Sequence, residues 1–366
     1  MPHPDITMSW VMAPQKTKSV GIQARSASPA VFSFADLFAG IGGMRFAFEA
    51  AGGECVLTSE IDEKARHTYN MQKWRRTSER HLEVHDVVEL GKMKKGHIPA
   101  FDVLVAGFPC QPYSIAGLRQ GLDDEKGRGQ VFLSILEILA KVRPKAFMLE
   151  NVKGMLSHDG GRTIEFMHRQ LATLGKKSEI YSVMAPQVLN SMTHGGVPQN
   201  RERVFLVGFL KGAGIDPMKF SWPAPKTLKT SLPELIQQDG VPEKYFYTAE
   251  KYDCYKEIEK TVTSYDTAYQ WRRVYVRENK SGVCPALTAN MGSGGHNVPL
   301  VRVKDGIRKL TPAECAKLQG FGKGFVIPTD IADAHLYHQF GNSVTVPLIE
   351  GIAKGIARVL PRKDRA

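Results

Sequence analysis

A cysteine between two prolines is the residue of this chain best suited to covalent chemistry. Residues 101–105 form an apolar run with β-branched side chains, which predicts a short buried strand of a parallel sheet. Cys110 follows this run, and in doubly wound sheets ligands gather beyond the carboxyl ends of strands. Because Pro109 and Pro112 fix φ beside it, we expect the thiol on a stiff loop, suited to attack on a substrate. The same pattern also fits a small buried thiol in a tight turn.

A carboxylate is predicted to face the same cleft. Residues 145–152 form another apolar run that carries Glu150 near its end, so Glu150 and Cys110 would follow neighbouring strands. An acid beside a thiol can protonate a heterocycle while the thiolate attacks its ring. In the structural alternative, Asn151 caps the next turn and Glu150 is its solvated neighbour.

Two arginines stand at the start of a further predicted strand. Residues 197–209 read as one strand, and its period of two places Gln199, Arg201 and Arg203 on one face. Arginines at a strand start can protect a sheet edge, or they can clamp an anion or a carbonyl group. The pattern leaves both interpretations open.

A glycine turn between an expected strand, residues 31–38, and an expected helix, residues 44–51, forms a candidate nucleotide site. Its glycines allow close backbone approach, and the helix N-terminus offers N–H groups to a ligand. Glu60 ends the next strand about twenty residues on, where a carboxylate can accept from ribose hydroxyls. Because Gly43 follows Gly42 at once, the spacing departs from the dinucleotide fingerprint. It favours a ligand without a pyrophosphate, such as S-adenosylmethionine.

Asp86 and a glycine-rich segment complete the candidate site. We expect residues 85–87 to end a third strand and to bring Asp86 near an adenine edge, although a solvated loop acid fits as well. Residues 117–129 contain glycines and several charges, which predicts a mobile loop that acts as a lid.

Helices are expected at three further places. Residues 131–139 form an apolar helical pattern, and residues 346–360 form an amphipathic one. Thr311, Pro312 and Glu314 have the types and spacing of an N-cap, a first helical position and the acid of a capping box.

The sequence pattern changes after residue 211. Strand–helix alternation becomes scarce, and seven of the eleven tyrosines fall between residues 245 and 275. Residues 271–277 interleave arginines with aromatic residues. In an extended segment Arg273, Tyr275 and Arg277 would share a face, which indicates either a nucleic-acid surface or an exposed amphipathic strand.

The amino-acid composition limits the kinds of protein that this chain can be. The 366 residues carry a formal net charge of +12, which predicts attraction to polyanions such as nucleic acid. The five cysteines are spread without a Cys-x-x-Cys pair, so neither a disulfide framework nor a metal site is expected, and a reducing cytoplasm fits. No apolar run approaches the ~18 residues of a membrane span. Residues 1–30 are expected to be a disordered basic tail, with an organelle transit peptide as the alternative.

These stretches together resemble the C5-cytosine DNA methyltransferase family, in that family's motif order, over roughly Phe32 to Ala357. The similar segments are Asp36–Gly43 (cofactor motif), Gly107–Gln111 (nucleophile motif), Glu150–Val152 (acid motif), Gln199–Arg203 (paired-arginine motif), Arg308–Cys315 (ninth motif) and Gly341–Val344 (tenth motif). The Cys-Phe-Thr signature of the family's RNA-methylating relatives is absent from residues 212–306, and RNA stays an open alternative substrate.

The resemblance implies an α/β, Rossmann-like methyltransferase fold with a doubly wound, mostly parallel sheet and a smaller, mixed target-recognition domain. It implies that Cys110 adds to carbon 6 of a flipped-out cytosine in a specific duplex DNA site. Carbon 5 then takes the methyl group of S-adenosylmethionine, leaving S-adenosylhomocysteine, without a metal. By resemblance the catalytic residues are Cys110, Glu150, Arg203 and Arg201, and the cofactor residues are Phe38, Gly40, Gly42, Glu60, Asp86 and Asn342. The DNA-binding residues are expected to be Gln111, Ser114, Arg128, Arg273, Arg277 and Thr288.

The resemblance also divides the chain into expected parts. Residues 31–211 and 332–366 would form the catalytic, cofactor-binding domain, residues 212–306 the target-recognition domain, and residues 307–331 a hinge with the ninth motif. The expected partner is double-stranded DNA, bound by a cytoplasmic monomer whose cell holds a cognate restriction endonuclease. Two other functions are weighed against this one: a catalytically silent DNA-binding homologue, and a nicotinamide-dependent dehydrogenase, which the glycine spacing disfavours.

Overall fold

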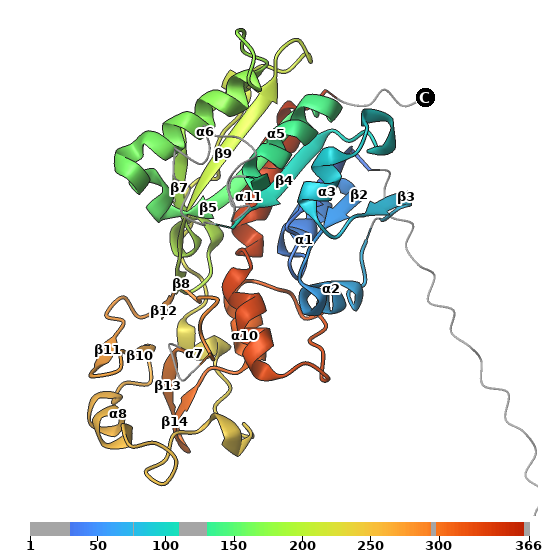
Figure 1. Cartoon of the computed structure of the whole chain (residues 1–366). Coiled ribbons are helices and arrows are strands. Elements are labelled where there is room, and N and C mark those ends of the chain that lie inside the picture. Colours follow the sequence, from blue (N-terminus) through green and yellow to red (C-terminus); the bar gives the residue numbers. More distant parts are fainter. Residues whose placement is uncertain (1–29, 76, 110–129, 294–297, 362–366) are drawn as a thin grey trace, which may run out of the picture.

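An eight-stranded sheet runs through the larger of two lobes (Figure 1). The computed structural model describes residues 30–75, 77–109, 130–293 and 298–361. The strand order is β3-β2-β1-β4-β5-β9-β6, and β7 also pairs with β9. Strands β1 to β5 are parallel, whereas β9 runs antiparallel to β5, β6 and β7. The strands are β1 (Phe32–Leu37), β2 (Gly53–Ser59), β3 (Thr77–Glu83), β4 (Val103–Gly107), β5 (Ala146–Val152), β6 (Tyr181–Val183), β7 (Gln187–Asn190) and β9 (Glu202–Leu210).

The strand order reverses between β1 and β4. From β1 the chain moves outward to β2 and β3, then returns to β4 on the other side of β1 and continues to β5. The predicted mostly parallel, doubly wound α/β sheet is therefore confirmed. Helices of this lobe are α1 (Gly43–Ala50), α2 (Glu63–Asn70), α3 (Val87–Lys92), α5 (Gln130–Val142), α6 (Arg162–Thr173) and α11 (Val346–Val359).

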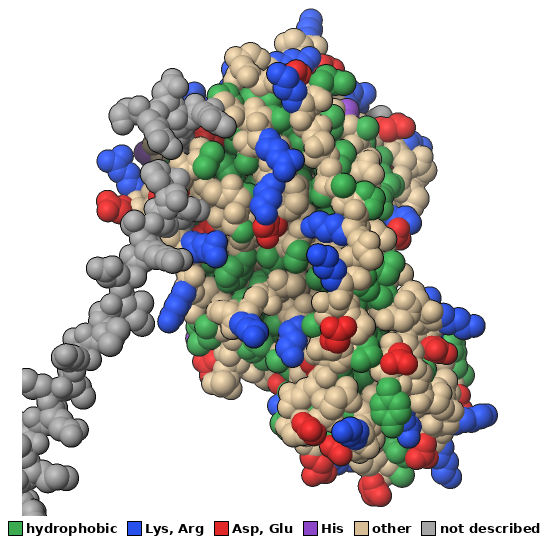
Figure 2. All heavy atoms as spheres, turned by 180° about the vertical axis from the view of Figure 1, so that it is seen from behind, with side chains coloured by type: hydrophobic (Ala, Val, Ile, Leu, Met, Phe, Trp, Pro, Cys, Tyr) green, Lys and Arg blue, Asp and Glu red, His purple; other side chains and the backbone are tan. Residues whose placement is uncertain are grey.

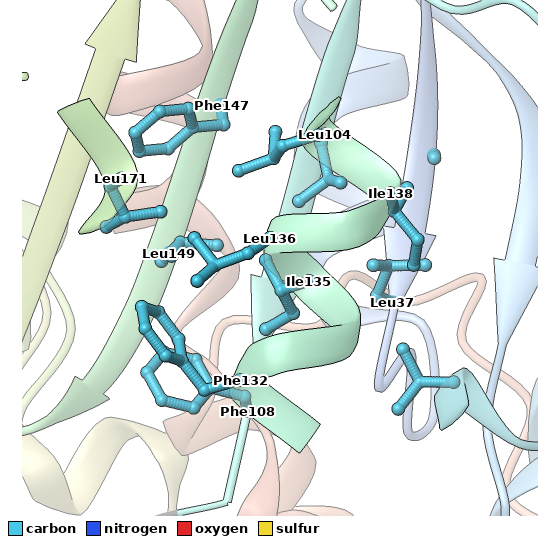
Figure 3. Close-up of a cluster of buried hydrophobic side chains, with 14 of the residues drawn as sticks. Leu37, Leu104, Phe108, Phe132, Ile135, Leu136, Ile138, Phe147, Leu149 and Leu171 are labelled. Atoms are coloured by element: carbon cyan, nitrogen blue, oxygen red, sulfur yellow. The ribbon is translucent and has the colours of Figure 1, made fainter. Parts of the chain in front are cut away.

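Side chains of the central strands alternate between two buried cores. Leu104 belongs to the core with α3, α5 and α6, whereas the next residue, Val105, belongs to the core with α1 and α11. Figure 3 shows the first core, where Leu37 of β1 and Leu104 of β4 lie beside Ile138 of α5. Because helices cover both faces, the central strands are apolar at almost every position, which explains the continuous apolar runs in the sequence.

The third strand ends earlier than predicted. β3 stops at Glu83, and Asp86 instead starts α3, where its carboxylate accepts a hydrogen bond from the Val88 N–H at 2.8 Å. The expectation that residues 85–87 end a strand is wrong, because the short acidic side chain caps a helix there.

The predicted strand over residues 197–209 is interrupted. Gln199–Asn200 forms β8, which pairs with β12 (Cys284–Pro285), and β9 begins only at Glu202. Arg201 lies between the two strands, so the prediction of one continuous strand is wrong. The chain changes pairing partner there because β8 joins the smaller lobe while β9 joins the main sheet.

The smaller lobe holds a four-stranded sheet of order β11-β10-β13-β14 (Figure 1). Its strands are β10 (Tyr269–Trp271), β11 (Val276–Glu278), β13 (Leu300–Val303) and β14 (Gly306–Lys309), and its helices are α7 (Leu232–Leu235), α8 (Tyr255–Thr261), α9 (Pro312–Leu318) and α10 (Asp333–Asn342). Shorter 3₁₀ turns are Lys95–His97, Lys153–Leu156, His158–Gly161, Pro217–Lys219 and Glu243–Tyr245, and Ser191–Gly195 is a π-helical turn. None of the helices in the described ranges has the length and apolar character needed to cross a membrane.

The aromatic and basic segment 271–277 is a hairpin. β10 ends at Trp271 and β11 begins at Val276, and the Arg272 N–H donates to the Tyr275 carbonyl at 2.8 Å. Arg273 lies in the turn with φ of 69°. The expectation that Arg273 and Arg277 share the face of one extended segment is therefore wrong, because the chain reverses between them.

Residues just after 211 remain with the larger lobe. Phe220 and Trp222 pack into the core that contains Ile352 of α11, and the two aromatic rings contact each other at a centroid distance of 5.0 Å. Conversely, Phe340 of α10 packs with the core of the smaller lobe. The predicted domain boundaries stay predictions. These contacts show that residues 220 and 222 pack with the larger lobe and that residue 340 packs with the smaller one.

A fully buried ion pair supports the predicted capped helix. The N-cap Thr311 and Glu314 exchange the two hydrogen bonds of a capping box, as expected from the sequence. Glu314 also binds Arg308 at 2.6 Å, and both side chains are almost completely buried. The pair also binds the segment after α7, since Glu314 accepts from the Gln237 N–H at 2.8 Å and Arg308 donates to the Gln237 carbonyl at 2.6 Å.

Removing one member of this pair is expected to destabilise the fold strongly. Glu314→Ala leaves the Arg308 charge buried without its partner, so we expect a loss of about 3–5 kcal/mol in the free energy of unfolding. Urea titration followed by circular dichroism measures it. The double variant Arg308→Met/Glu314→Leu, which removes both charges, should recover much of the loss. A double variant as unstable as the single one would contradict this.

Candidate active site

A cavity of about 360 Å³ opens where the strand order reverses. The segment that follows β1 and the segment that follows β4 form neighbouring parts of its wall, as expected at a switch point of an open α/β sheet. The predicted site residues that line this one cavity are Phe38, Gly40, Glu60, Glu150, Arg201, Arg203 and Asn342.

The glycine turn after β1 forms one wall. Phe38 and Gly40 have positive φ values of 56° and 55°, and a Cβ atom built on Gly40 would meet no atom within 4 Å. The space beside Gly40 is therefore open to a ligand. Gly42 does not line the cavity; its missing side chain makes room for Trp74, whose ring carbon would lie 2.2 Å from a Cβ atom there. Its predicted contact with the cofactor stays a prediction.

Glu60 holds the turn in place. Its carboxylate accepts hydrogen bonds from the Gly40 N–H at 2.7 Å and from the Asp62 N–H at 2.8 Å. Burial raises the pKa of Glu60, and the two N–H groups act in the opposite direction. Asp86 lies apart from the cavity lining, at the start of α3, so its proposed contact with the adenine edge is not part of this wall.

A carboxylate–guanidinium pair forms the opposite wall. Glu150 on β5 stands beside Gly107 of β4 in the parallel register, and it is largely buried. The Arg203 Nε lies 3.1 Å from Glu150 Oε1. Asn151, considered in the sequence only as a cap, donates from Nδ2 to the Phe108 carbonyl at 3.0 Å. It therefore fixes the backbone just before Pro109, which also lines the cavity.

Several predicted residues lie outside the described residues. These are the nucleophile Cys110, the DNA-binding residues Gln111, Ser114 and Arg128, and the segment 117–129 predicted as a lid. The described chain reaches Pro109, and its last residues before Cys110 line the same cavity as Glu150.

Arg201 lines the cavity, but its guanidinium donates hydrogen bonds to main-chain carbonyls. Its side chain is almost fully buried and donates to the carbonyls of Leu287 at 2.7 Å, Gly341 at 3.1 Å and Ser343 at 2.6 Å. Burial, reinforced by the charge of Arg203, lowers the pKa of Arg201. The two neighbouring arginines thus have different environments: Arg203 faces the carboxylate, and Arg201 binds two backbone segments, one at Leu287 and one at residues 341–343.

The predicted DNA-binding residues of the smaller lobe lie in two places. Arg273 and Arg277 belong to the β10–β11 hairpin, whose turn also exposes Val274 and Tyr275. Thr288 is exposed and follows β12, where its backbone packs directly against Gly341 of α10. The two groups therefore belong to different loops of the smaller lobe.

His338 is a cavity residue that the sequence analysis did not single out. It lies one helical turn before Asn342 on α10, and the two side chains are hydrogen-bonded at 3.0 Å. The sequence analysis expected no helix over these residues, so the spacing of four residues that brings the two side chains together was not recognised.

A buried polar cluster lies behind the glycine turn. Arg45 of α1 is almost fully buried, pairs with Glu49 at 2.7 Å, donates to the Tyr69 hydroxyl at 2.8 Å and stacks over Trp74. Asp36 of β1 is fully buried, and its carboxyl oxygens have no hydrogen-bond partner among the residues that the structure describes. Burial raises the pKa of Asp36 to about 8, against the opposing charge of Arg45.

This raised pKa predicts a loss of stability with rising pH. The unfolded chain releases the Asp36 proton near pH 3.8 and the folded chain only near pH 8, so between these values unfolding is favoured increasingly. Asn does not titrate, so the wild type should lose unfolding free energy relative to Asp36→Asn as the pH rises from 5 to 8. The loss is at most about 1.4 kcal/mol per pH unit. Urea titrations across this range measure it; parallel curves for the two proteins would contradict it.

Comparisons with known proteins agree on one family. The family profile described as C-5 cytosine-specific DNA methylase matches residues 32–358. The chain is 43% identical over 329 residues to the Type II methyltransferase M.Bsp6I of Bacillus sp. (strain RFL6), covering 89% of this chain and 98% of that protein. It is 37% identical to M.HpaII of Haemophilus parainfluenzae, covering 90% of each chain.

Solved structures share the fold. The S. pombe Dnmt2 methyltransferase matches with a TM-score of 0.64 at 16% identity, covering 90% of this chain and 98% of that one. The Entamoeba histolytica methyltransferase EhMeth matches with a TM-score of 0.65 at 16% identity, covering 92% of this chain and 100% of that one. The predicted Rossmann-like methyltransferase fold is confirmed.

Proposed function

Because the chain belongs to the C-5 cytosine-specific DNA methylase family and is a cytosine-5 DNA methyltransferase, we propose that it methylates one cytosine of a specific duplex site through a covalent Cys110 adduct. The observation that carries the proposal is the placement of the Glu150–Arg203 pair and the glycine turn in one cavity, which Pro109 also lines. This shared lining supports the proposal that one cavity receives both the cytosine ring and the methyl donor.

The cavity fits S-adenosylmethionine. The open space beside Gly40 admits close backbone approach, and Glu60 presents a carboxylate that can accept from ribose hydroxyls. Phe38 and Asn342 complete the proposed cofactor contacts within the cavity, and Gly42 and Asp86 are proposed from the family resemblance. When bound, the cofactor supplies the electrophilic methyl group.

The residues around the cytosine would act as follows. The Cys110 thiolate forms a bond to carbon 6, which makes carbon 5 nucleophilic, and Glu150 holds or protonates ring N3 as electrons move onto it. Arg203 stabilises the charge that develops on the O2 side of the ring. After methyl transfer, loss of the carbon 5 proton to a base releases the Cys110 sulfur, so that the aromatic ring and the free thiol are restored.

Access to carbon 6 requires the cytosine to leave the duplex. A thiolate attacks from the face of the ring, which stacking covers in double-stranded DNA, and extrusion costs a few kcal/mol. We propose that Thr288, the hairpin arginines Arg273 and Arg277, and Gln111, Ser114 and Arg128 contribute the DNA contacts. Figure 2 shows Lys and Arg side chains gathered over one side of the larger lobe and near the junction of the lobes, which supports binding of a polyanion.

We also propose the biological setting from the relatives. Those reported above are named Type II methyltransferases, which supports a role in a restriction–modification system with a restriction endonuclease in the same cell. A cytoplasmic monomer acting on double-stranded DNA fits this role. Its recognition domain would lie within residues 212–306, followed by a hinge in residues 307–331.

Substitutions at the nucleophile and the acid test the mechanism. With labelled S-adenosylmethionine and unmethylated duplex DNA, Cys110→Ala is expected to abolish labelling, and Glu150→Gln to lower kcat by about 10²–10⁴ because it cannot donate a proton to N3. Cys254→Ala is the matched control, since this thiol lies outside the cavity lining. Duplex DNA containing 5-fluorocytosine should trap the wild type at Cys110. Labelling that survives Cys110→Ala would refute the covalent route, and a wild type that is trapped on 5-fluorocytosine DNA but labels no unmodified duplex would contradict the methylation proposal.

The two arginines should separate catalysis from stability. We expect Arg203→Met to lower kcat by about 10²-fold or more, since Arg203 acts on developing charge. It should lower the melting temperature less than Arg201→Met does, because Glu150, which loses its partner, lines the open cavity where water can reach it. Arg201→Met removes the guanidinium donors of the Leu287 and Gly341 carbonyls and one of the two donors of the Ser343 carbonyl, so it should lower the melting temperature by several degrees. Differential scanning calorimetry and initial rates measure both. Equal effects of the two variants on both quantities would contradict this division.

A further inference from the structure

One histidine joins the cofactor residue Asn342 to the loop that carries Thr288. His338 Nδ1 lies 3.0 Å from the Ala289 carbonyl oxygen, and His338 Nε2 lies 3.0 Å from Asn342 Nδ2. We propose that His338 is a positioning residue: it orients the Asn342 amide toward the cofactor, and the Ala289 carbonyl selects the tautomer that allows this. The inference rests on the proposed function, because it takes Asn342 as a cofactor contact.

The chemistry of the two partners determines the protons on the ring. A carbonyl oxygen only accepts, so Nδ1 must carry the hydrogen that it donates to Ala289. In the neutral ring, Nε2 is then an acceptor, and it takes a hydrogen from the Asn342 Nδ2. The Asn342 Oδ1 is thereby the end of the amide that remains to meet a hydrogen-bond donor of the cofactor, in the cavity that Asn342 lines.

The carbonyl that selects this tautomer is firmly held. Leu287, two residues before Ala289, is fixed at both main-chain groups: its N–H donates to Gln199 Oε1 at 3.1 Å, and its carbonyl accepts from Arg201 at 2.7 Å. The Thr288 backbone touches Gly341 so closely that a Cβ atom there would lie 2.1 Å from the Thr288 carbonyl carbon. Because the segment cannot shift along α10, the Ala289 carbonyl is a fixed reference for the ring.

A second proton on the ring would reverse the arrangement. Nε2 would then carry a hydrogen that faces the Asn342 NH₂ group, so two donors would oppose each other. The amide would have to turn, presenting Oδ1 to the ring and Nδ2 to the cavity. The protonation state of His338 therefore decides whether the cofactor meets an acceptor or a donor.

The charged groups to be considered near the ring lie on α10 and in the cavity lining. On α10 itself, His335 contacts Lys64 of α2, and Asp333 pairs with Lys244 at 2.7 Å. Residues 287–289 carry no charge. The ionisable groups that share the cavity lining with His338 are Glu60, Asp62, Glu150, Arg201 and Arg203.

Binding of S-adenosylhomocysteine at several pH values tests the proposal without catalysis. Calorimetric titrations of the full chain from pH 5.5 to pH 8.0 compare the wild type with His338→Gln and His338→Ala. Glutamine presents one donor and one acceptor but does not titrate, so it should retain the affinity measured at pH 8 and keep it at lower pH. The wild type should lose affinity as the pH falls. His338→Ala should bind about tenfold more weakly at pH 8, the effect of one hydrogen bond.

A matched control separates this role from a general effect on α10. His335→Gln changes the same residue type one turn earlier on the same helix, and should leave both the affinity and its pH dependence as in the wild type. In methylation assays, His338→Ala should raise the KM for S-adenosylmethionine by about tenfold and change kcat much less.

The outcomes are distinguishable from failure of the proposed function. Wild-type affinity in His338→Ala, or the same pH dependence in the wild type and His338→Gln, would overturn the role of His338 alone. Absence of S-adenosylhomocysteine binding to the wild type would overturn the cofactor assignment, and the role of His338 with it. Binding that behaves as expected in a protein that labels no DNA would leave His338 intact and refute the methylation proposal.

Discussion

The reversal of strand order between β1 and β4 is the constraint on which the site depends. Strands on the two sides of this point connect through helices on opposite faces of the sheet, so the segments after β1 and β4 diverge and leave a cavity. Glu60, Gly40 and Glu150 reach that cavity because each lies at the carboxyl end of a parallel strand or directly after it. The apolar cores on both faces keep the strand ends in register.

The opposite side of the cavity is made by segments distant in sequence, and hydrogen bonds to the main chain hold them together. Arg201 binds the carbonyls of Leu287, Gly341 and Ser343, and Gln199 binds Leu287 as well. A guanidinium can serve several carbonyls at once because its donors form a planar fork. The interruption between β8 and β9 places Arg201 where its guanidinium can bind these carbonyls.

Two almost fully buried ion pairs among the described residues are extended by further hydrogen bonds, whereas a buried carboxyl group beside the glycine turn has none. Arg308–Glu314 and Arg45–Glu49 are each almost fully buried, and both pairs are extended by bonds to neighbouring groups. Such extension offsets the cost of removing the charges from water. Asp36 lacks such bonds within the described chain, and its pKa of about 8 keeps the carboxyl largely protonated at pH 7. A carboxyl group whose pKa is raised this far by burial, beside a glycine turn, is typical of a binding site.

The sequence by itself determined the doubly wound sheet, the capped helix at Thr311 and the placement of Glu150 at a strand end beside Gly107, because apolar runs, caps and strand ends depend on nearby residues. It could not determine the end of β3, where capping by Asp86 prevailed over strand propensity, or the hairpin at Arg273. The different environments of Arg201 and Arg203, and the contact of His338 with Asn342 and Ala289, were decided by the tertiary structure alone. These depend on which distant carbonyls and carboxylates the fold brings within hydrogen-bonding distance, and no local pattern encodes that.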